Sequence, residues 1–82
     1  MIILRHIAYS PTQIVVSLSD PGEGGFMMSP RRLVETQIAP MLAPEALIVL
    51  RGPEEARREV VEELAAVVPE PCATWILEEA IP

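Results

Sequence analysis

The feature that most limits how this chain can fold is a run of five apolar residues, Ala46 to Leu50, shortly before the start of a helix. A continuous apolar run of this length is typical of a strand that is covered on both faces. Pro53 suits the first position of a helix, and Glu54 and Glu55 place negative charge where the helix dipole is positive. The pattern predicts a buried strand that leads directly into a helix.

This helix is expected to run from Pro53 to Val68 and to pack through one apolar stripe. Pro69 and Pro71 end it, and residues 72–80 predict a further strand. A strand, a helix and a second strand of these lengths form a βαβ unit with a right-handed crossover. The residues of the stripe recur at helical spacing: Ala56, Val60, Leu64, Val67 and Val68, with Val61 beside them.

Two further strands are predicted near the N-terminus, over residues 2–9 and 13–19. The turn signal Ser-Pro-Thr between them favours an antiparallel hairpin. Strict alternation along the first strand places Ile7 and Tyr9 on the same face as Arg5, with His6 on the opposite face.

A short helix is expected over residues 31–39. Ser29 is a good N-cap, Pro30 suits the first turn, and Pro40 ends the helix. The element order is therefore β-β-α-β-α-β in a single domain, residues 1–82. The predicted class is α/β (α+β): a two-layer sandwich in which two helices cover one face of a four-stranded mixed sheet.

The other face of this sheet has no helix to cover it, although the run from Ala46 to Leu50 is apolar on both sides. A second copy of the chain is the simplest cover, so the sequence predicts a homodimer.

Charge and composition exclude several classes of partner and chemistry. The net charge is −6, and nine of the twelve acidic residues lie in residues 42–82. Such an acidic chain is not expected to bind nucleic acid or an anionic membrane surface. The absence of lysine excludes a Schiff base and a P-loop. With a single cysteine and no signal peptide, the expected location is the cytoplasm.

The stretch SDPGEGGFMMSPRR, residues 19–32, is the most distinctive sequence in the chain. We expect a glycine-rich connecting loop that contacts a partner protein. Methionine adapts to irregular binding surfaces, and the neighbouring arginines would set orientation. The predicted partner-binding residues are Phe26, Met27, Met28, Arg31 and Arg32.

The alternative is an anion- or nucleotide-binding loop. Glycine-rich turns before a helix hold phosphates through backbone N–H groups. The G-x-G-x-x-G spacing is absent, however, and Asp20 and Glu23 bring negative charge. The residues of this alternative site are Gly24, Gly25, Ser29, Arg31 and Arg32.

No catalytic constellation is present in the sequence. His6 and Cys72 are the single histidine and cysteine, and no motif supplies either with a partner group. We therefore expect no enzyme, no cofactor and no metal site. The predicted function is a small stand-alone interaction or regulatory protein that binds and modulates another protein, an inhibitor or adaptor of the phage or mobile-element type.

Overall fold

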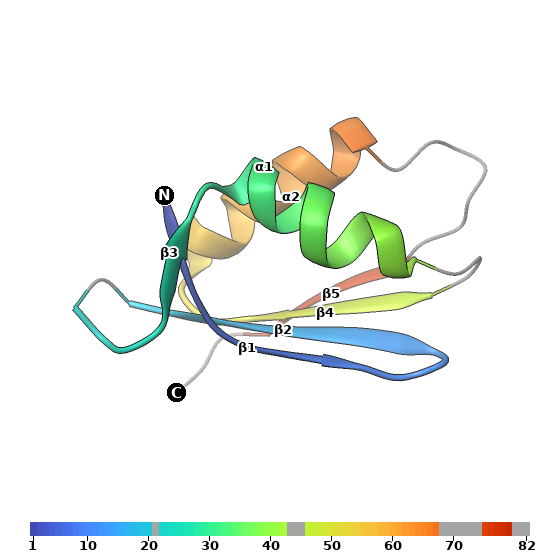
Figure 1. Cartoon of the computed structure of the whole chain (residues 1–82), viewed down its shortest axis with the longest axis horizontal. Helices are drawn as coiled ribbons and strands as arrows, with labels where there is room; N and C mark the ends of the chain where they lie inside the picture. Colours follow the sequence, from blue (N-terminus) through green and yellow to red (C-terminus); the bar gives the residue numbers. More distant parts are fainter. Residues whose placement is uncertain (21, 43–45, 68–74, 80–82) are drawn as a thin grey trace.

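The computed structural model of the chain describes residues 1–20, 22–42, 46–67 and 75–79. Five strands form one sheet in the order β3-β1-β2-β4-β5 (Figure 1). The strands are β1 (Ile2–Tyr9), β2 (Gln13–Ser19), β3 (Phe26–Met28), β4 (Leu47–Arg51) and β5 (Trp75–Glu79). The helical segments are α1 (Pro30–Leu33), the π-helical η1 (Val34–Ile38), the short 3-10 turn η2 (Ala39–Met41) and α2 (Glu54–Val67).

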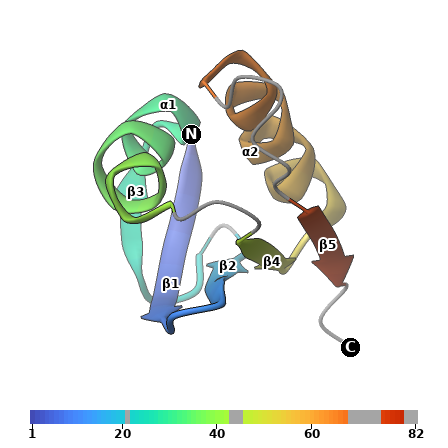
Figure 2. The same cartoon turned by 90° about the vertical axis from the view of Figure 1, so that its right-hand side faces the viewer.

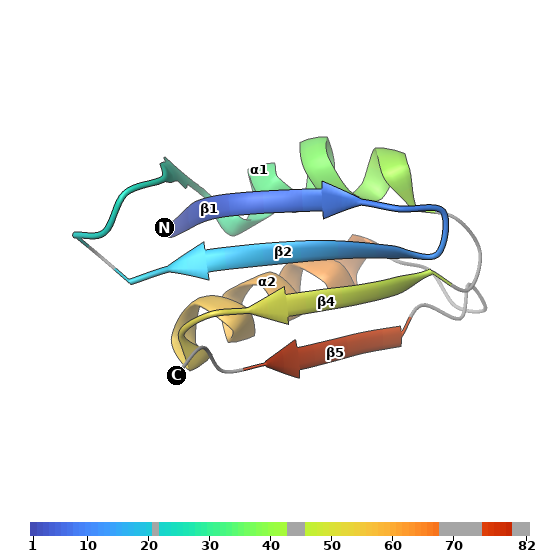
Figure 3. The ribbon, with the colours of Figure 1, turned by 90° about the horizontal axis from the view of Figure 1, so that it is seen from below.

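The predicted two-layer fold class is confirmed. Strands β1 and β2 pair antiparallel, whereas β4 is parallel to both of its neighbours, β2 and β5. From β2 to β4 to β5 the strand order advances in one direction. Because parallel crossovers are right-handed, the helical segment that begins with α1 and the helix α2 lie on the same face of the sheet (Figures 2 and 3). Among the described residues, no helix covers the other face.

The structure corrects the prediction for residues 26–28, which were expected in a connecting loop. All four predicted strands are present, as β1, β2, β4 and β5, and β3 adds a short fifth strand at the edge of the sheet. β3 pairs antiparallel with Ile2, Ile3 and Leu4 of β1. Three consecutive apolar residues show no alternation between apolar and polar side chains, so the sequence of this segment does not predict a strand. The strand forms because the segment pairs with β1, which is distant in the sequence.

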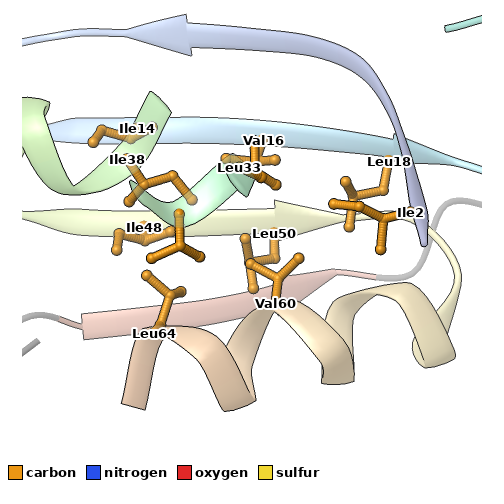
Figure 4. Packing of buried hydrophobic residues seen from close by; sticks show 11 residues of the cluster. Ile2, Ile14, Val16, Leu18, Leu33, Ile38, Ile48, Leu50, Val60 and Leu64 are labelled. Atoms are coloured by element: carbon orange, nitrogen blue, oxygen red, sulfur yellow. The ribbon is translucent and has the colours of Figure 1, made fainter. Parts of the chain in front are cut away.

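The core lies between the sheet and the helices. Val60 and Leu64 point from α2 toward Ile48 and Leu50 of β4, and all four side chains are fully buried (Figure 4). The predicted stripe of α2 therefore packs through Val60 and Leu64, with Ala56 and Val61 beside them, whereas Val67 of the stripe is exposed. Its predicted last residue, Val68, lies outside the described residues. The cluster comprises Ile2, Ile14, Val16, Leu18, Leu33, Val34, Ile38, Ile48, Leu50, Val60 and Leu64.

The face assignment predicted for β1 is wrong beyond residue 4. The pairing of β1 with β2 shifts by one residue between Leu4 and His6, which is a β-bulge. After the bulge, Ile7 and Tyr9 lie opposite Val16 and Ile14, which are core residues. Arg5 is the extra residue, so Ile7 and Tyr9 lie on the same side as Leu4, and His6 lies on the opposite side.

Gly52 fixes the turn between β4 and α2. Its φ is +134°, in the region that favours glycine, and a Cβ atom there would lie 2.5 Å from the carbonyl oxygen of Leu18. Arg57 closes the same turn from α2. It donates from Nε to the carbonyl oxygen of Gly52 over 2.9 Å and from Nη1 to Glu78 of β5 over 3.1 Å.

Within the described residues, no helix is long and apolar enough to cross a membrane.

Candidate protein-contact surface

Among the described residues, Phe26 of β3 is the most exposed large apolar side chain at 75%, followed by Met1 at 73% and Met27 of β3 at 66%. We call Phe26 and Met27 the β3 patch. Met28, the third predicted contact residue, is half-buried and packs against the core cluster. The structure therefore brings two of the three apolar contact residues to the surface, and the third anchors their strand.

The glycine-rich turn before β3 has a defined backbone. The N–H of Glu23 donates to the carbonyl of Asp20 over 3.1 Å, and the hydroxyl of buried Ser19 donates to the carbonyl of Gly24 over 3.4 Å. Gly25 has a φ of +145°, and a Cβ atom there would lie 2.7 Å from the carbonyl oxygen of Leu4. Gly25 is thus the residue that lets the chain approach β1 and begin β3.

Ser29 acts as the predicted N-cap of α1. Its hydroxyl accepts a hydrogen bond from the backbone N–H of Arg32 over 3.1 Å. This bond uses an N–H group at the helix start that an anion would otherwise need. The extended backbone of β3 also separates Ser29 from Gly25 by about 13 Å, at about 3.3 Å per residue. The residues of the alternative anion site do not converge on one cradle.

Arg31 is engaged within α1 and η1. Its Nε donates to Oε1 of Glu35 over 2.7 Å, four residues along the helix. This hydrogen bond and the charge of Glu35, with a further contribution from Glu63 of α2, raise the pKa of Arg31 above its ordinary value. Arg32 is exposed, and its guanidinium forms no ion pair with another described residue. Of the two predicted arginines, Arg32 is thus the one available to a carboxylate.

The hollow beside the end of β2 is acidic. The hollow has a volume of about 350 Å³. Met1 and Glu59 both line it, and Oε1 of Glu59 lies 3.9 Å from the amino group of Met1. An anion would meet three carboxylates there, so the hollow gives no support to the anion-binding alternative. Its lining includes the apolar residues Ile2, Ile3 and Ala56 and the acidic residues Asp20, Glu55 and Glu59.

The two candidate nucleophile or base residues are not brought into a described site. His6 is exposed beside the bulge of β1 and lies opposite Ser17 of β2. Cys72 lies outside the described residues. No group of three or more His, Cys, Asp or Glu side chains that could hold a metal ion occurs in the described part of the chain.

Tyr9 and Arg5 are exposed residues of β1 that were not among the predicted contact residues. Tyr9 is 41% exposed, and its hydroxyl donates to the carbonyl oxygen of Gln37 in η1 over 2.8 Å. Partial burial raises the pKa of Tyr9 above its ordinary value.

Comparison of the chain with protein families, with curated proteins and with solved structures gives no match.

Proposed function

We propose that this chain is a protein-interaction module that acts by association, with no catalysis of its own, and that the β3 patch is its main contact surface. The observation that carries the proposal is the exposure of Phe26 and Met27 on a backbone held by pairing with β1. As consecutive residues of a strand, the two side chains point to opposite faces, Phe26 to the side of the helices and Met27 to the other, so a partner that binds the edge itself would contact both. Modulation of the bound protein, as an inhibitor or adaptor, is part of the same proposal.

The local charge fits a protein partner. Residues 1–41 carry three acidic residues and three arginines, whereas the whole net charge of −6 lies in residues 42–82. The β3 patch therefore belongs to the neutral half of the chain. The exposed Arg32 can orient a carboxylate of an approaching protein.

The test compares proteins captured by the tagged wild-type chain with those captured by two variants, from extracts of cells that express the chain natively. The Phe26→Ala/Met27→Ala variant should lose specific partners, which quantitative mass spectrometry would identify. Met41→Ala is the matched control, because Met41 is also an exposed methionine, at 54%, but lies in η2. It should retain every partner.

Equal capture by the wild type and the double variant would contradict the proposal. The anion-binding alternative makes a different forecast. Inorganic phosphate would raise the melting temperature of the wild type, and Arg31→Ala would abolish that rise.

A further inference from the structure

We propose that an extended segment of the partner adds to the sheet at the free edge of β1, beside Arg5 to Tyr9 and next to Phe26. This inference rests on the proposed function and gives the partner a chemistry: a strand that alternates apolar and acidic residues. Addition of a strand to a sheet edge obtains affinity from main-chain hydrogen bonds and specificity from alternate side chains.

The edge of the sheet is stepped. β1 has eight residues, but β3 pairs only with Ile2, Ile3 and Leu4. From Arg5 to Tyr9, no described strand pairs with β1 on the side away from β2, and β1 runs on past β3 (Figure 3). An unpaired strand edge presents backbone N–H and C=O groups that can template another strand. The open length is therefore five residues, in line with β3.

An apolar row borders this open length on the helix-covered side. Phe26 pairs with Leu4, which packs on the core, so Phe26 lies on that side of the sheet at one end. Ile7 is half-buried in the middle, and Tyr9 lies at the other end, held by its hydrogen bond to Gln37. Cross-strand neighbours of this kind stabilise a strand pair by contact between aromatic and branched side chains. Every second residue of the added strand should thus be apolar.

The polar side chains at this edge belong to Arg5 and His6. Arg5, at the bulge, is exposed and forms no ion pair with another described residue. His6 is also exposed, and its pairing opposite Ser17 places it on the face away from the helices. Acidic residues of the added strand on this side would lie near His6, and Arg5 is the exposed cation of the same edge. The intervening positions of the added strand should therefore be acidic.

The probe is a capped eight-residue peptide of alternating valine and glutamate, with a valine–lysine peptide as its comparator. Binding is measured by amide chemical shifts and by hydrogen exchange of the backbone N–H groups from Arg5 to Tyr9. We expect the glutamate peptide to bind at least about tenfold tighter than the lysine peptide and to protect N–H groups of this stretch. Arg5→Gln should weaken binding about two- to fivefold at low salt, as expected for one exposed charge pair. Arg58→Gln, on the exposed face of α2, should leave it unchanged.

Backbone pairing is separated from side-chain contact by two N-methylated forms of the glutamate peptide, with methyl groups on the valines or on the glutamates. Only alternate N–H groups of an added strand face β1. One form should therefore lose binding and the other retain it. Equal binding of both forms, or no binding of the parent peptide at 1 mM (about the weakest affinity of interest), would overturn strand addition.

The outcomes distinguish this inference from the proposed function. If native partners depend on Phe26 and Met27 but both methylated peptides bind alike, strand addition is wrong and the contact surface stands. If one methylated form binds but native partners ignore the Phe26→Ala/Met27→Ala change, strand addition stands and the β3 patch is not the main contact surface. Protection of Arg5 to Tyr9 that grows with protein concentration, without peptide, would assign the edge to a second copy and overturn the inference.

Discussion

Replacing Leu64 by alanine tests how α2 is docked. Leu64 is only 1% exposed and points from α2 toward Ile48 of β4 (Figure 4). The change removes three carbon groups from the core, worth roughly 2.4 kcal/mol at about 0.8 kcal/mol each. The cavity left behind adds to this, so the expected loss of unfolding free energy is about 2–5 kcal/mol. Because a small domain has about 5–15 kcal/mol in total, the variant should be markedly less stable.

Urea denaturation followed by circular dichroism measures this loss. The midpoint should fall while the denaturant slope stays unchanged, because the surface exposed on unfolding is nearly the same. Val67→Ala is the control on the same helix, since Val67 is 37% exposed and should cost less than about 1 kcal/mol. A loss below about 0.5 kcal/mol for Leu64→Ala would show that this face of α2 does not pack on the sheet.

Two further predictions concern the turn before β3 and the state of assembly. Gly25→Ala should destabilise the fold by about 1–3 kcal/mol, the usual cost of a strained backbone position, and should loosen β3 in hydrogen exchange. Gly24→Ala should do neither, because a Cβ atom at Gly24 would have nothing within 4 Å; similar effects of the two changes would contradict the role given to Gly25. Sedimentation equilibrium at micromolar concentration should report a mass above the 9.0 kDa of one chain, since a second copy is expected on the helix-free face; a monomer would refute that expectation.

The order of strands and helices could be predicted because each element carries a local signal. The apolar run before Pro53, the stripe of α2 and the N-cap at Ser29 each depend on residues close in sequence. The strand order within the sheet itself was not predicted; given that β2, β4 and β5 follow one another in one direction, the handedness rule puts both helices on the same face. The strands and helices expected from local sequence patterns are thus the ones found over most of the described chain.

The features that sequence reasoning missed depend on pairing between distant residues. The bulge at Arg5 is set by how β1 meets β2, and β3 exists because Phe26 to Met28 meet the start of β1. One missed contact was readable from the sequence: Glu35 stands four residues after Arg31, the spacing of a helical ion pair, and the two side chains form that pair. Strict alternation, applied across Arg5 without knowledge of the bulge, places His6 on the side of Leu4, whereas in the structure Ile7 shares that side and His6 lies opposite.

The helix-free face and the stepped edge are suited to different partners. The centre of the face carries Ala8, Val15, Leu47 and Val49, and polar residues lie on the same face at its borders: His6, Gln13, Ser17 and Arg51. An aliphatic centre of this kind suits packing against a second sheet at about 10 Å. Phe26 lies on the opposite, helix-covered side, so sheet-on-sheet packing would leave it free. Phe26→Ala should therefore reduce binding to other proteins without changing the sedimentation mass. A fall in mass to that of one chain would show that both kinds of association use the same surface.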